Sequence, residues 1–239
     1  MSAKLSTAML MAAGLGKRMR PLTATRPKPL VRVAGKALID HALEKIEAAG
    51  IWRVIVNVHY LPDSVIAHLN ARKCGAEYLI SDERDKLLET GGGLMKAASL
   101  LGDQPFLCAN SDNLWVDGPR DSILMLAELW DDAKMDALLL MIPHARATCH
   151  TGPGDFHMAP DGRLSRRKPG HVAPFVYTGV QILSPRVLVD PPAEIFSTNI
   201  FWNRAMAAGR LYGASHPGLW FDVGTPQAIP VVEAELGHG

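Results

Sequence analysis

Short apolar segments alternate with longer segments of helical periodicity along the first 143 residues of the chain. Runs that predict buried strands lie at 9–13, 53–58, 77–80, 105–109 and 136–143. Segments in which apolar residues recur every three or four positions lie at 37–49, 63–70, 94–101 and 120–130. Because strands and helices alternate, we predict an α/β fold in which a mainly parallel sheet is covered by helices on both faces.

The pattern becomes less regular after residue 143. Residues 144–154 are polar, and the pair Asp161-Gly162 then separates two short segments, 155–158 and 164–167, which predicts a β-hairpin. The remaining expected elements are a strand over 172–183, a helix over 195–208, a strand over 211–214 and a closing helix over 227–236.

Composition and charge narrow the class of protein. Hydrophobic residues make up 48% of the 239 residues, enough for a full core without disulfides. The net charge of +1 gives no bulk electrostatic basis for binding nucleic acid or a membrane surface. Cys74, Cys108 and Cys149 show no metal-ligand spacing, so we expect reduced thiols in a cytoplasmic protein. We also expect a monomer, since the chain has no long C-terminal extension that would build an assembly.

The stretch 9–30 carries the strongest chemical signal. Its apolar run breaks at Gly14 and Gly16, where missing side chains let backbone N–H groups approach an anion. A basic cluster follows at Lys17 and Arg18, and two prolines brace Lys28. Lysine and arginine hold phosphate oxygens, and a rigid loop loses less entropy on binding. We interpret this stretch as a cradle for a nucleoside triphosphate.

The alternatives to a triphosphate cradle fit this stretch less well. Two glycines after a strand occur in many turns, and basic loop residues are usually just solvated. A redox dinucleotide fold requires a third glycine and a helix, but position 19 is methionine and Pro21 follows. The spacing of the glycines also differs from that of a P-loop.

Two further segments indicate chemistry. Gly91-Gly92-Gly93 precedes a helical run, which fits either a flexible helix entry or a close backbone approach to a flat ligand such as a base. Asp112 follows an apolar strand, where it fits either a cap of the next turn or a ligand of Mg²⁺. The histidines show no spacing typical of a metal site, and we assign none of them to one.

The string A-A-G-x-G-x-R-x-x-P-L-T-x-x-x-P-K-P-L over residues 12–30 resembles the signature of sugar-1-phosphate nucleotidylyltransferases. The string W-x-D-x-G-T-P over 220–226 also resembles that family. The resemblance implies a Rossmann-like three-layer sandwich with a mainly parallel, mixed sheet and a β-hairpin lid over the sugar site. It implies one nucleotidyltransferase domain over 1–239, with a nucleotide-binding half at about 1–143 and a sugar-phosphate half at about 144–239.

The resemblance also implies roles for individual residues. Lys28 and Arg18 would be catalytic, and Asp112 and Asp222 would hold Mg²⁺. The nucleotide would be bound by Ala12, Ala13, Gly14, Leu15, Gly16, Lys17, Arg18, Lys28, Gly91, Gly92, Asn110 and Ser111. The sugar phosphate would be bound by Asn113, Gly154, Asp155, Thr178 and Gly179. Ser111 departs from the glycine that the family has at this position.

The basic cluster Arg166, Arg167 and Lys168 fits either a solvated hairpin arm, which we favour slightly, or a contact with an acidic sugar. Within the family, the chain resembles most the small bacterial enzymes that act on N-acetylmuramic acid 1-phosphate with uridine triphosphate, in cell-wall recycling. The resemblance therefore implies transfer of a nucleotidyl group from uridine triphosphate to that sugar phosphate. A guanylyltransferase for mannose or heptose 1-phosphate, a cytidylyltransferase for a phosphoalcohol and a non-catalytic regulatory module are the alternatives.

Overall fold

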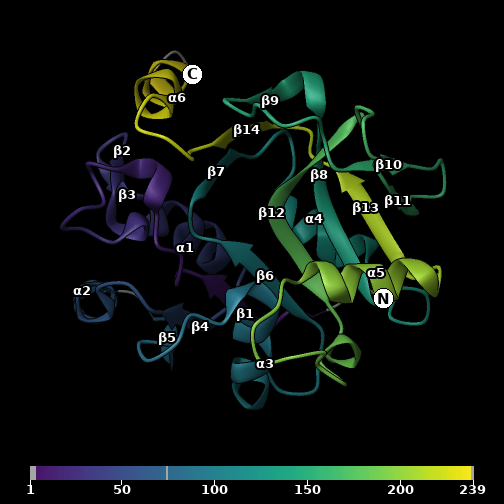
Figure 1. Ribbon diagram of the computed structural model, residues 1–239, viewed down its shortest axis with the longest axis horizontal. Coiled ribbons are helices and arrows are strands. Elements are labelled where there is room, and N and C mark those ends of the chain that lie inside the picture. Colours follow the sequence, from purple (N-terminus) through teal and green to yellow (C-terminus); the bar gives the residue numbers. More distant parts are fainter. Residues whose placement is uncertain (1–3, 74, 238–239) are drawn as a thin grey trace.

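The computed structural model describes residues 4–73 and 75–237, so Cys74 lies outside the described residues. One large sheet runs through both halves of the chain, in the order β11-β10-β12-β6-β1-β4-β5, and β8 joins β13 to β12 (Figure 1). Its strands are β1 (Thr7–Met11), β4 (Arg53–Val58), β5 (Glu77–Asp82), β6 (Phe106–Asn110), β8 (Ala137–Pro143), β10 (Phe156–Met158), β11 (Leu164–Arg166), β12 (Phe175–Leu183) and β13 (Leu211–Ser215).

The sheet is mixed. Strands β6, β1, β4 and β5 are parallel neighbours, and β8 pairs in parallel with β13. Strand β12 runs antiparallel to both β6 and β8, so it joins the two parallel parts. The predicted hairpin forms as β10 and β11 and extends the sheet at one edge.

Helices cover both faces of the sheet, as the sequence pattern predicts. They are α1 (Leu38–Ala48), α2 (Pro62–Ala71), α3 (Glu89–Leu101), α4 (Ser122–Leu129), α5 (Asn199–Ala207) and α6 (Ala228–Gly237). Apolar residues of α1, α2 and α4 pack in one core cluster on one face, and those of α3 and α5 pack in a second cluster on the other. In Figure 1, α5 crosses in front of β8 and β12, whereas α4 lies behind them.

A second, three-stranded sheet is absent from the sequence-based prediction. It consists of β7 (Asn113–Val116), β14 (Leu219–Asp222) and β9 (Ala147–Thr148), with β14 in the centre. Residues of β7 and β14 form a third core cluster with Met19, Val31 and Val33 and with α6. Met19 and Val31 belong to the segment 12–31 between β1 and β2, here called the basic loop. A small hairpin of β2 (Arg32–Val33) and β3 (Lys36–Ala37) ends this loop. The basic loop is therefore anchored on the second sheet.

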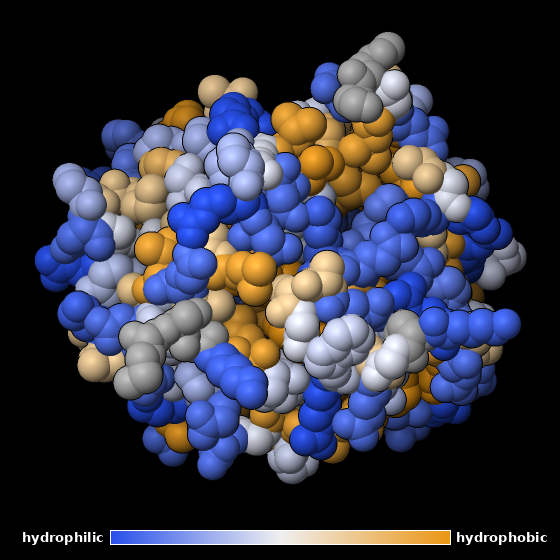
Figure 2. Space-filling view, turned by 180° about the vertical axis from the view of Figure 1, so that it is seen from behind, coloured by the Kyte–Doolittle hydropathy of each residue, from blue (hydrophilic) through white to orange (hydrophobic). Residues whose placement is uncertain are grey.

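Two of the boundaries that differ from the prediction lie at the candidate site. Strand β1 ends at Met11, so Ala12 and Ala13 already belong to the loop. Helix α3 begins at Glu89, so the three glycines lie inside its first two turns and not in a loop before it. Among the described residues, no helix is long and apolar enough to cross a membrane. Seen from behind, hydrophilic residues and separate hydrophobic patches are interspersed over the surface (Figure 2).

Candidate functional site

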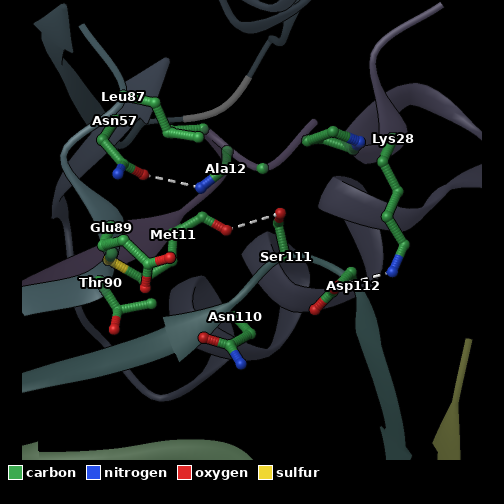
Figure 3. A pocket seen from close by; sticks show the side chains of 13 residues that line it. Met11, Ala12, Lys28, Asn57, Leu87, Glu89, Thr90, Asn110, Ser111 and Asp112 are labelled. Carbon is green, nitrogen blue, oxygen red and sulfur yellow. Dashed lines mark hydrogen bonds and ion pairs between the residues drawn. The ribbon is translucent and has the colours of Figure 1, made fainter. Parts of the chain in front are cut away.

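The loop after β1 is fixed by two neighbouring strand ends. The side chain of Asn57, at the end of β4, accepts a hydrogen bond of 2.7 Å from the backbone N–H of Ala12. The backbone N–H and hydroxyl of Ser111, after β6, both donate to the carbonyl of Met11, at 3.1 and 2.8 Å (Figure 3). Because parallel strands end at one edge of the sheet, this is where an α/β protein binds its ligand.

The two glycines of the loop differ in their surroundings. Gly16 has φ +59°, and a Cβ there would lie 2.9 Å from the Cβ of Lys28, so the loop itself requires glycine. Its carbonyl accepts a 2.8 Å hydrogen bond from the hydroxyl of Thr23. A Cβ at Gly14 would meet nothing within 4 Å. Gly14 therefore leaves open space in front of the backbone, which suits the approach of a phosphate.

A cavity of about 250 Å³, here called the loop cavity, lies beside these residues. The carboxyl ends of β1 and β6 and the start of α3 contribute to it (Figure 3). Its lining consists of Met11, Ala12, Ala13, Gly14, Lys28, Pro29, Asn57, Leu87, Glu89, Thr90, Asn110, Ser111 and Asp112. Six of the predicted nucleotide-binding residues, together with Asp112, are thus brought together.

Lys28 crosses from the basic loop to the sheet. It begins a short 3-10 turn, Lys28–Leu30, that is braced by a proline on each side. The residue is only 7% exposed, and its Nζ lies 2.7 Å from a carboxylate oxygen of Asp112 (Figure 3). A buried ammonium needs a partner or a bound anion, and here a carboxylate holds it at the edge of the loop cavity.

A second cavity, of about 210 Å³ and here called the acidic cavity, adjoins the first. The two share Asn110 and Asp112. Its lining consists of Arg18, Asn110, Asp112, Asn113, His150, Asp155, Val176, Tyr177, Trp220 and Asp222. Both predicted metal ligands and Arg18 therefore face one space.

The second sheet explains how the two aspartates meet across 110 residues of chain. Strand β14 pairs antiparallel with β7, and Asp222 stands opposite Asn113 in that register. Asp112 is the residue directly before Asn113. Register is strongly specified where one face of a strand is buried, and Trp115, Trp220 and Phe221 are all buried here.

His150 and Cys149 border the Asp222 carboxylate. The Nδ1 of His150 lies 3.7 Å from an oxygen of Asp222, and its ring packs against Trp220. Burial, together with the Asp222 charge, raises the pKa of the Cys149 thiol. This thiol therefore stays protonated and is a poor nucleophile or metal ligand at neutral pH.

The acidic cavity offers oxygen ligands of the kind that Mg²⁺ prefers. Mg²⁺ is commonly held by one or two carboxylates and by substrate phosphates, with water completing the shell. Asp112 and Asp222 supply two carboxylates. In the part of the chain that the structure describes, no group of three His, Cys, Asp or Glu forms a full metal cage. The arrangement fits a Mg²⁺ ion shared with a bound phosphate better than a resident structural metal.

The predicted sugar-phosphate residues divide into two groups. Asn113 and Asp155 line the acidic cavity. Gly154, Thr178 and Gly179 do not belong to its lining, and their contacts are with neighbouring parts of the chain. The hydroxyl of Thr178 donates to the carbonyl of Leu140 at 2.8 Å.

The two glycines of this second group are needed for close packing. A Cβ at Gly179 would lie 2.1 Å from the amide of Asn113, and one at Gly154 would lie 2.2 Å from the carbonyl oxygen of Ala173. Gly179 therefore allows the close approach of Asn113, and Gly154 allows the close approach of Ala173.

The glycines of α3 also serve packing. The N–H groups of Gly91 and Gly92 both donate to the carbonyl of Phe196, at 2.8 and 3.1 Å. A Cβ at Gly91 would lie 2.5 Å from the Phe196 ring, and one at Gly92 would lie 2.3 Å from the Glu194 carbonyl oxygen. The close backbone approach expected from the sequence is thus made by the chain itself, while Glu89 and Thr90 line the loop cavity.

Other members of the predicted set, Leu15 and Lys17, follow in the loop, and Lys17 is exposed. Sequence reasoning missed Asn57, Tyr177 and His150. A signal existed for Asn57, because it is a polar residue in the otherwise apolar strand end Val54–Val58. Tyr177 lies in an expected strand and His150 in a polar segment without metal-ligand spacing, and only the tertiary structure places them at a cavity wall.

Comparison with known proteins agrees with this geometry. Residues 7–149 match the nucleotidyl transferase family. Over 234 residues the chain is 44% identical to the N-acetylmuramate alpha-1-phosphate uridylyltransferase of Caulobacter vibrioides, with 97% of each chain covered. It is 31% identical to the mannose-1-phosphate guanyltransferase of Aspergillus fumigatus over 92% of this chain and 61% of that protein. The UDP-glucose pyrophosphorylase of Acinetobacter baumannii has a similar fold, with a TM-score of 0.80 at 16% identity over 98% of this chain and 94% of that one.

Proposed function

This chain belongs to the nucleotidyl transferase family, and on that premise we propose that it transfers a uridylyl group from uridine triphosphate to N-acetylmuramic acid 1-phosphate. The products are the corresponding uridine diphosphate sugar and pyrophosphate. The reaction would serve cell-wall recycling in the cytoplasm, since its acceptor carries N-acetylmuramic acid, a sugar of peptidoglycan.

One observation supports the reaction most directly. Lys28, Asp112 and Asp222 come from three distant parts of the chain and meet where the loop cavity adjoins the acidic cavity. One cavity carries the glycine loop, and the other carries the predicted sugar-phosphate residues Asn113 and Asp155. A phosphate group at the junction would touch both substrates at once.

The chemistry needs alignment and charge neutralisation more than proton transfer. A phosphate oxygen of the sugar 1-phosphate attacks the α-phosphorus of the nucleotide. The bond from that phosphorus to the bridging oxygen breaks, and pyrophosphate leaves with the electron pair. The attacking phosphate is already ionised at neutral pH, so a general base is unnecessary.

The residues of the site match these needs. Arg18 and the N–H groups after Gly14 would hold the departing phosphates, because a guanidinium and a glycine loop both suit polyphosphate oxygens. Lys28 would exchange its ion pair with Asp112 for the reacting phosphates. That exchange places its charge where negative charge accumulates in the transition state.

Asp112 and Asp222 would hold Mg²⁺ in the acidic cavity. Bound there, the ion supplies Lewis-acid polarisation of phosphate oxygens and screening between the two anionic substrates. His150 would help to keep the Asp222 carboxylate in place, because its Nδ1 lies 3.7 Å from that carboxylate and its ring packs against Trp220.

The choice of substrates rests on relatives. Identity of 44% over nearly the whole of both chains supports the uridylyl and N-acetylmuramic acid pair. A guanylyl transfer to mannose 1-phosphate is the second candidate, because a guanyltransferase is 31% identical, although the chain spans only 61% of that protein.

A two-by-two substrate panel tests the proposal. Pyrophosphate release by the purified chain with Mg²⁺ would be measured for uridine or guanosine triphosphate, each with N-acetylmuramic acid 1-phosphate or mannose 1-phosphate. We expect fast release only with uridine triphosphate and N-acetylmuramic acid 1-phosphate together. Release confined to the guanosine and mannose pair would replace the proposed substrates, and absence of release in all four would refute the reaction.

A further inference from the structure

Arg166 is a half-buried guanidinium without a carboxylate partner. Two of the four partly buried arginines are neutralised by carboxylates: Arg72 by Asp40 and Glu47, and Arg210 by Asp136. Arg166 forms no ion pair among the described residues. Burial lowers the pKa of this guanidinium, although arginine stays charged at any physiological pH. A desolvated charge without a counter-ion is costly, so it calls for a physical reason.

Four neighbouring side chains, here called the frame, hold the Arg166 guanidinium in place, but none of them neutralises its charge. Its Nη2 donates to the side-chain oxygens of Asn199 at 2.7 Å and Asn203 at 3.2 Å, and its Nε also donates to Asn203 at 3.3 Å. These amides are neutral acceptors. The group also lies over the Phe156 ring, 4.7 Å from the centroid, and 5.4 Å from that of Trp202. Among the described residues, Nη1 has no hydrogen-bond partner.

The neighbouring basic residues lack this arrangement. The side chain of Arg167 donates to the backbone carbonyls of Gly154 at 3.1 Å and His171 at 2.9 Å, so it ties the hairpin to the adjacent loop. Lys168 is exposed. Only Arg166 of this cluster combines partial burial, aromatic support and unused donors.

Arg166 lies next to the wall of the acidic cavity. The Trp202 ring that it contacts packs edge-on against Tyr177, with centroids 4.8 Å apart, and Tyr177 lines that cavity. Asp155, which also lines the cavity, accepts a hydrogen bond from the Tyr177 N–H at 2.9 Å and is close enough to act on the Arg166 charge. The guanidinium is thus linked to the lining of the acidic cavity through the Trp202 and Tyr177 rings and through the charge of Asp155.

We propose that Arg166, in its frame of Asn199, Asn203, Phe156 and Trp202, is the subsite that binds a carboxylate carried by the acceptor sugar. This inference rests on the proposed function, in which the acceptor is a sugar acid. N-acetylmuramic acid differs from N-acetylglucosamine by a lactyl ether whose carboxylate is ionised at neutral pH. A planar guanidinium with free N–H groups matches a carboxylate in geometry and charge.

The neutral frame has a clear use in this role. Asparagine amides and aromatic faces orient the fork and leave its charge available, whereas an aspartate hydrogen-bonded directly to the guanidinium would compete with the incoming carboxylate. Discrimination against an acceptor without the carboxylate then follows, because that acceptor would leave the guanidinium unpaired.

The test compares two acceptors that differ in the lactyl group. The KM values for N-acetylmuramic acid 1-phosphate and N-acetylglucosamine 1-phosphate would be measured with saturating uridine triphosphate. In the natural chain we expect the acidic sugar to have the lower KM by about tenfold to a hundredfold, the range of a hydrogen-bonded charge pair. In Arg166→Gln we expect this ratio to fall toward one, and in Arg166→Lys to fall partly.

Arg163→Gln is the matched control. Arg163 lies on the same hairpin, is exposed and is paired with Asp161, so its loss should keep the natural ratio. A ratio near one in the natural chain would overturn the inference, and so would an Arg166→Gln variant that raises both KM values equally. The natural-chain ratio keeps the inference falsifiable even if Arg166→Gln folds poorly.

Binding of each acceptor to the natural chain, measured by calorimetry, separates this inference from the proposed function. Lack of turnover with every acceptor would refute the function. Equal binding of the two acceptors would refute the Arg166 subsite alone.

Discussion

Lys28 and Asp112 show how a single residue pair can prepare a site for anions. Each neutralises the other at 2.7 Å while Lys28 is almost fully buried. A substrate phosphate would draw the ammonium away from the carboxylate and leave Asp112 free for a metal ion. The ion pair therefore keeps both charged groups in the site, and burying the Lys28 ammonium costs less free energy than it would without Asp112.

Lys28→Met tests the part of this pair that acts on the phosphates. We expect kcat to fall by about 10²-fold or more, as for removal of one transition-state donor, with a smaller change in KM for uridine triphosphate. Steady-state kinetics at saturating substrates check this. Near-normal kcat would exclude Lys28 from the reaction, and a thermal melt would show whether the unpaired Asp112 has destabilised the fold.

Asp112→Asn and Asp222→Asn test the metal role. Each change removes one charged oxygen ligand and keeps the shape of the side chain, so we expect less than about a tenth of the natural Mg²⁺-dependent rate in either variant. Asp155→Asn is a useful comparison, because Asp155 lines the same cavity from the sugar side. A variant of Asp112 or Asp222 that kept most of the rate would lose its place as a metal ligand.

Gly14 and Gly16 provide a matched pair of substitutions. A Cβ at Gly14 meets open space, so Gly14→Ala should keep the melting temperature and raise KM for uridine triphosphate. Gly16 has φ +59° and no room beside Lys28, so Gly16→Ala should cost about 1–3 kcal/mol of folding free energy. That loss corresponds to roughly 2–4 °C in Tm for each kcal/mol. Equal behaviour of the two variants in melts and kinetics would contradict the distinction between a ligand-facing glycine and a structural one.

At the level of single residues, the sequence pointed to candidate charged residues more readily than to the residues that support them. Lys28 and Asp222 are recognisable because they stand in long composite strings, and Asp112 is recognisable because it follows an apolar strand. Asn57 and Tyr177 are not, because a polar group at a strand end and a buried tyrosine have ordinary structural uses. Their contribution depends on which strand ends lie side by side, and that is a tertiary property.

At the level of elements, the main strands and helices followed from hydrophobic periodicity. The segment predicted at 53–58 coincides with β4, and the predicted hairpin forms at β10 and β11. The prediction that a loop of glycines precedes α3 was wrong, because tertiary packing overrode the low helix propensity of glycine. Segment 194–196 lies so close to α3 that only glycine fits.

The pairing of β7 with β14 could not be predicted from the sequence. Each strand has only four residues, and they lie about a hundred positions apart. Local propensity says nothing about such a partner. This pairing nevertheless brings Asp222 to Asp112, so the element that sequence reasoning missed completes the candidate metal site.

His216 connects the second sheet to α4 and gives a prediction at this scale. It is fully buried, its Nε2 donates to the carbonyl of Leu219 at 2.9 Å, and its Nδ1 accepts from the hydroxyl of Ser122 at 3.0 Å. Burial lowers its pKa. A group whose folded pKa lies below its unfolded value of about 6.5 binds more protons when unfolded, so its contribution to stability is lost as pH falls below that value.

We therefore expect Tm of the natural chain to fall between about pH 7.5 and about pH 5.5, and we expect His216→Gln to show a smaller fall. His157→Gln is the matched control, because His157 is exposed and its loss should leave the pH dependence as it was. An unchanged slope in His216→Gln would show that other groups dominate the acid sensitivity.

At the level of the whole molecule, one mixed sheet joins the two halves that the sequence suggested. The antiparallel strand β12 pairs with β6 from the nucleotide side and with β8. Both cavities lie at the end of this sheet, and they share Asn110 and Asp112. The architecture thus holds the two cavities on one continuous sheet, and this continuity suits the proposed in-line transfer between a nucleotide and a sugar phosphate.

The fate of the α-phosphate tests the central claim most directly. The purified chain would be incubated with Mg²⁺, N-acetylmuramic acid 1-phosphate and uridine triphosphate labelled at the α-phosphorus. We predict that the label moves into the nucleotide sugar while unlabelled pyrophosphate is released, and that neither product forms without the sugar phosphate. Label that stays in the triphosphate, or that is released as uridine monophosphate regardless of the sugar, would contradict transfer at this site.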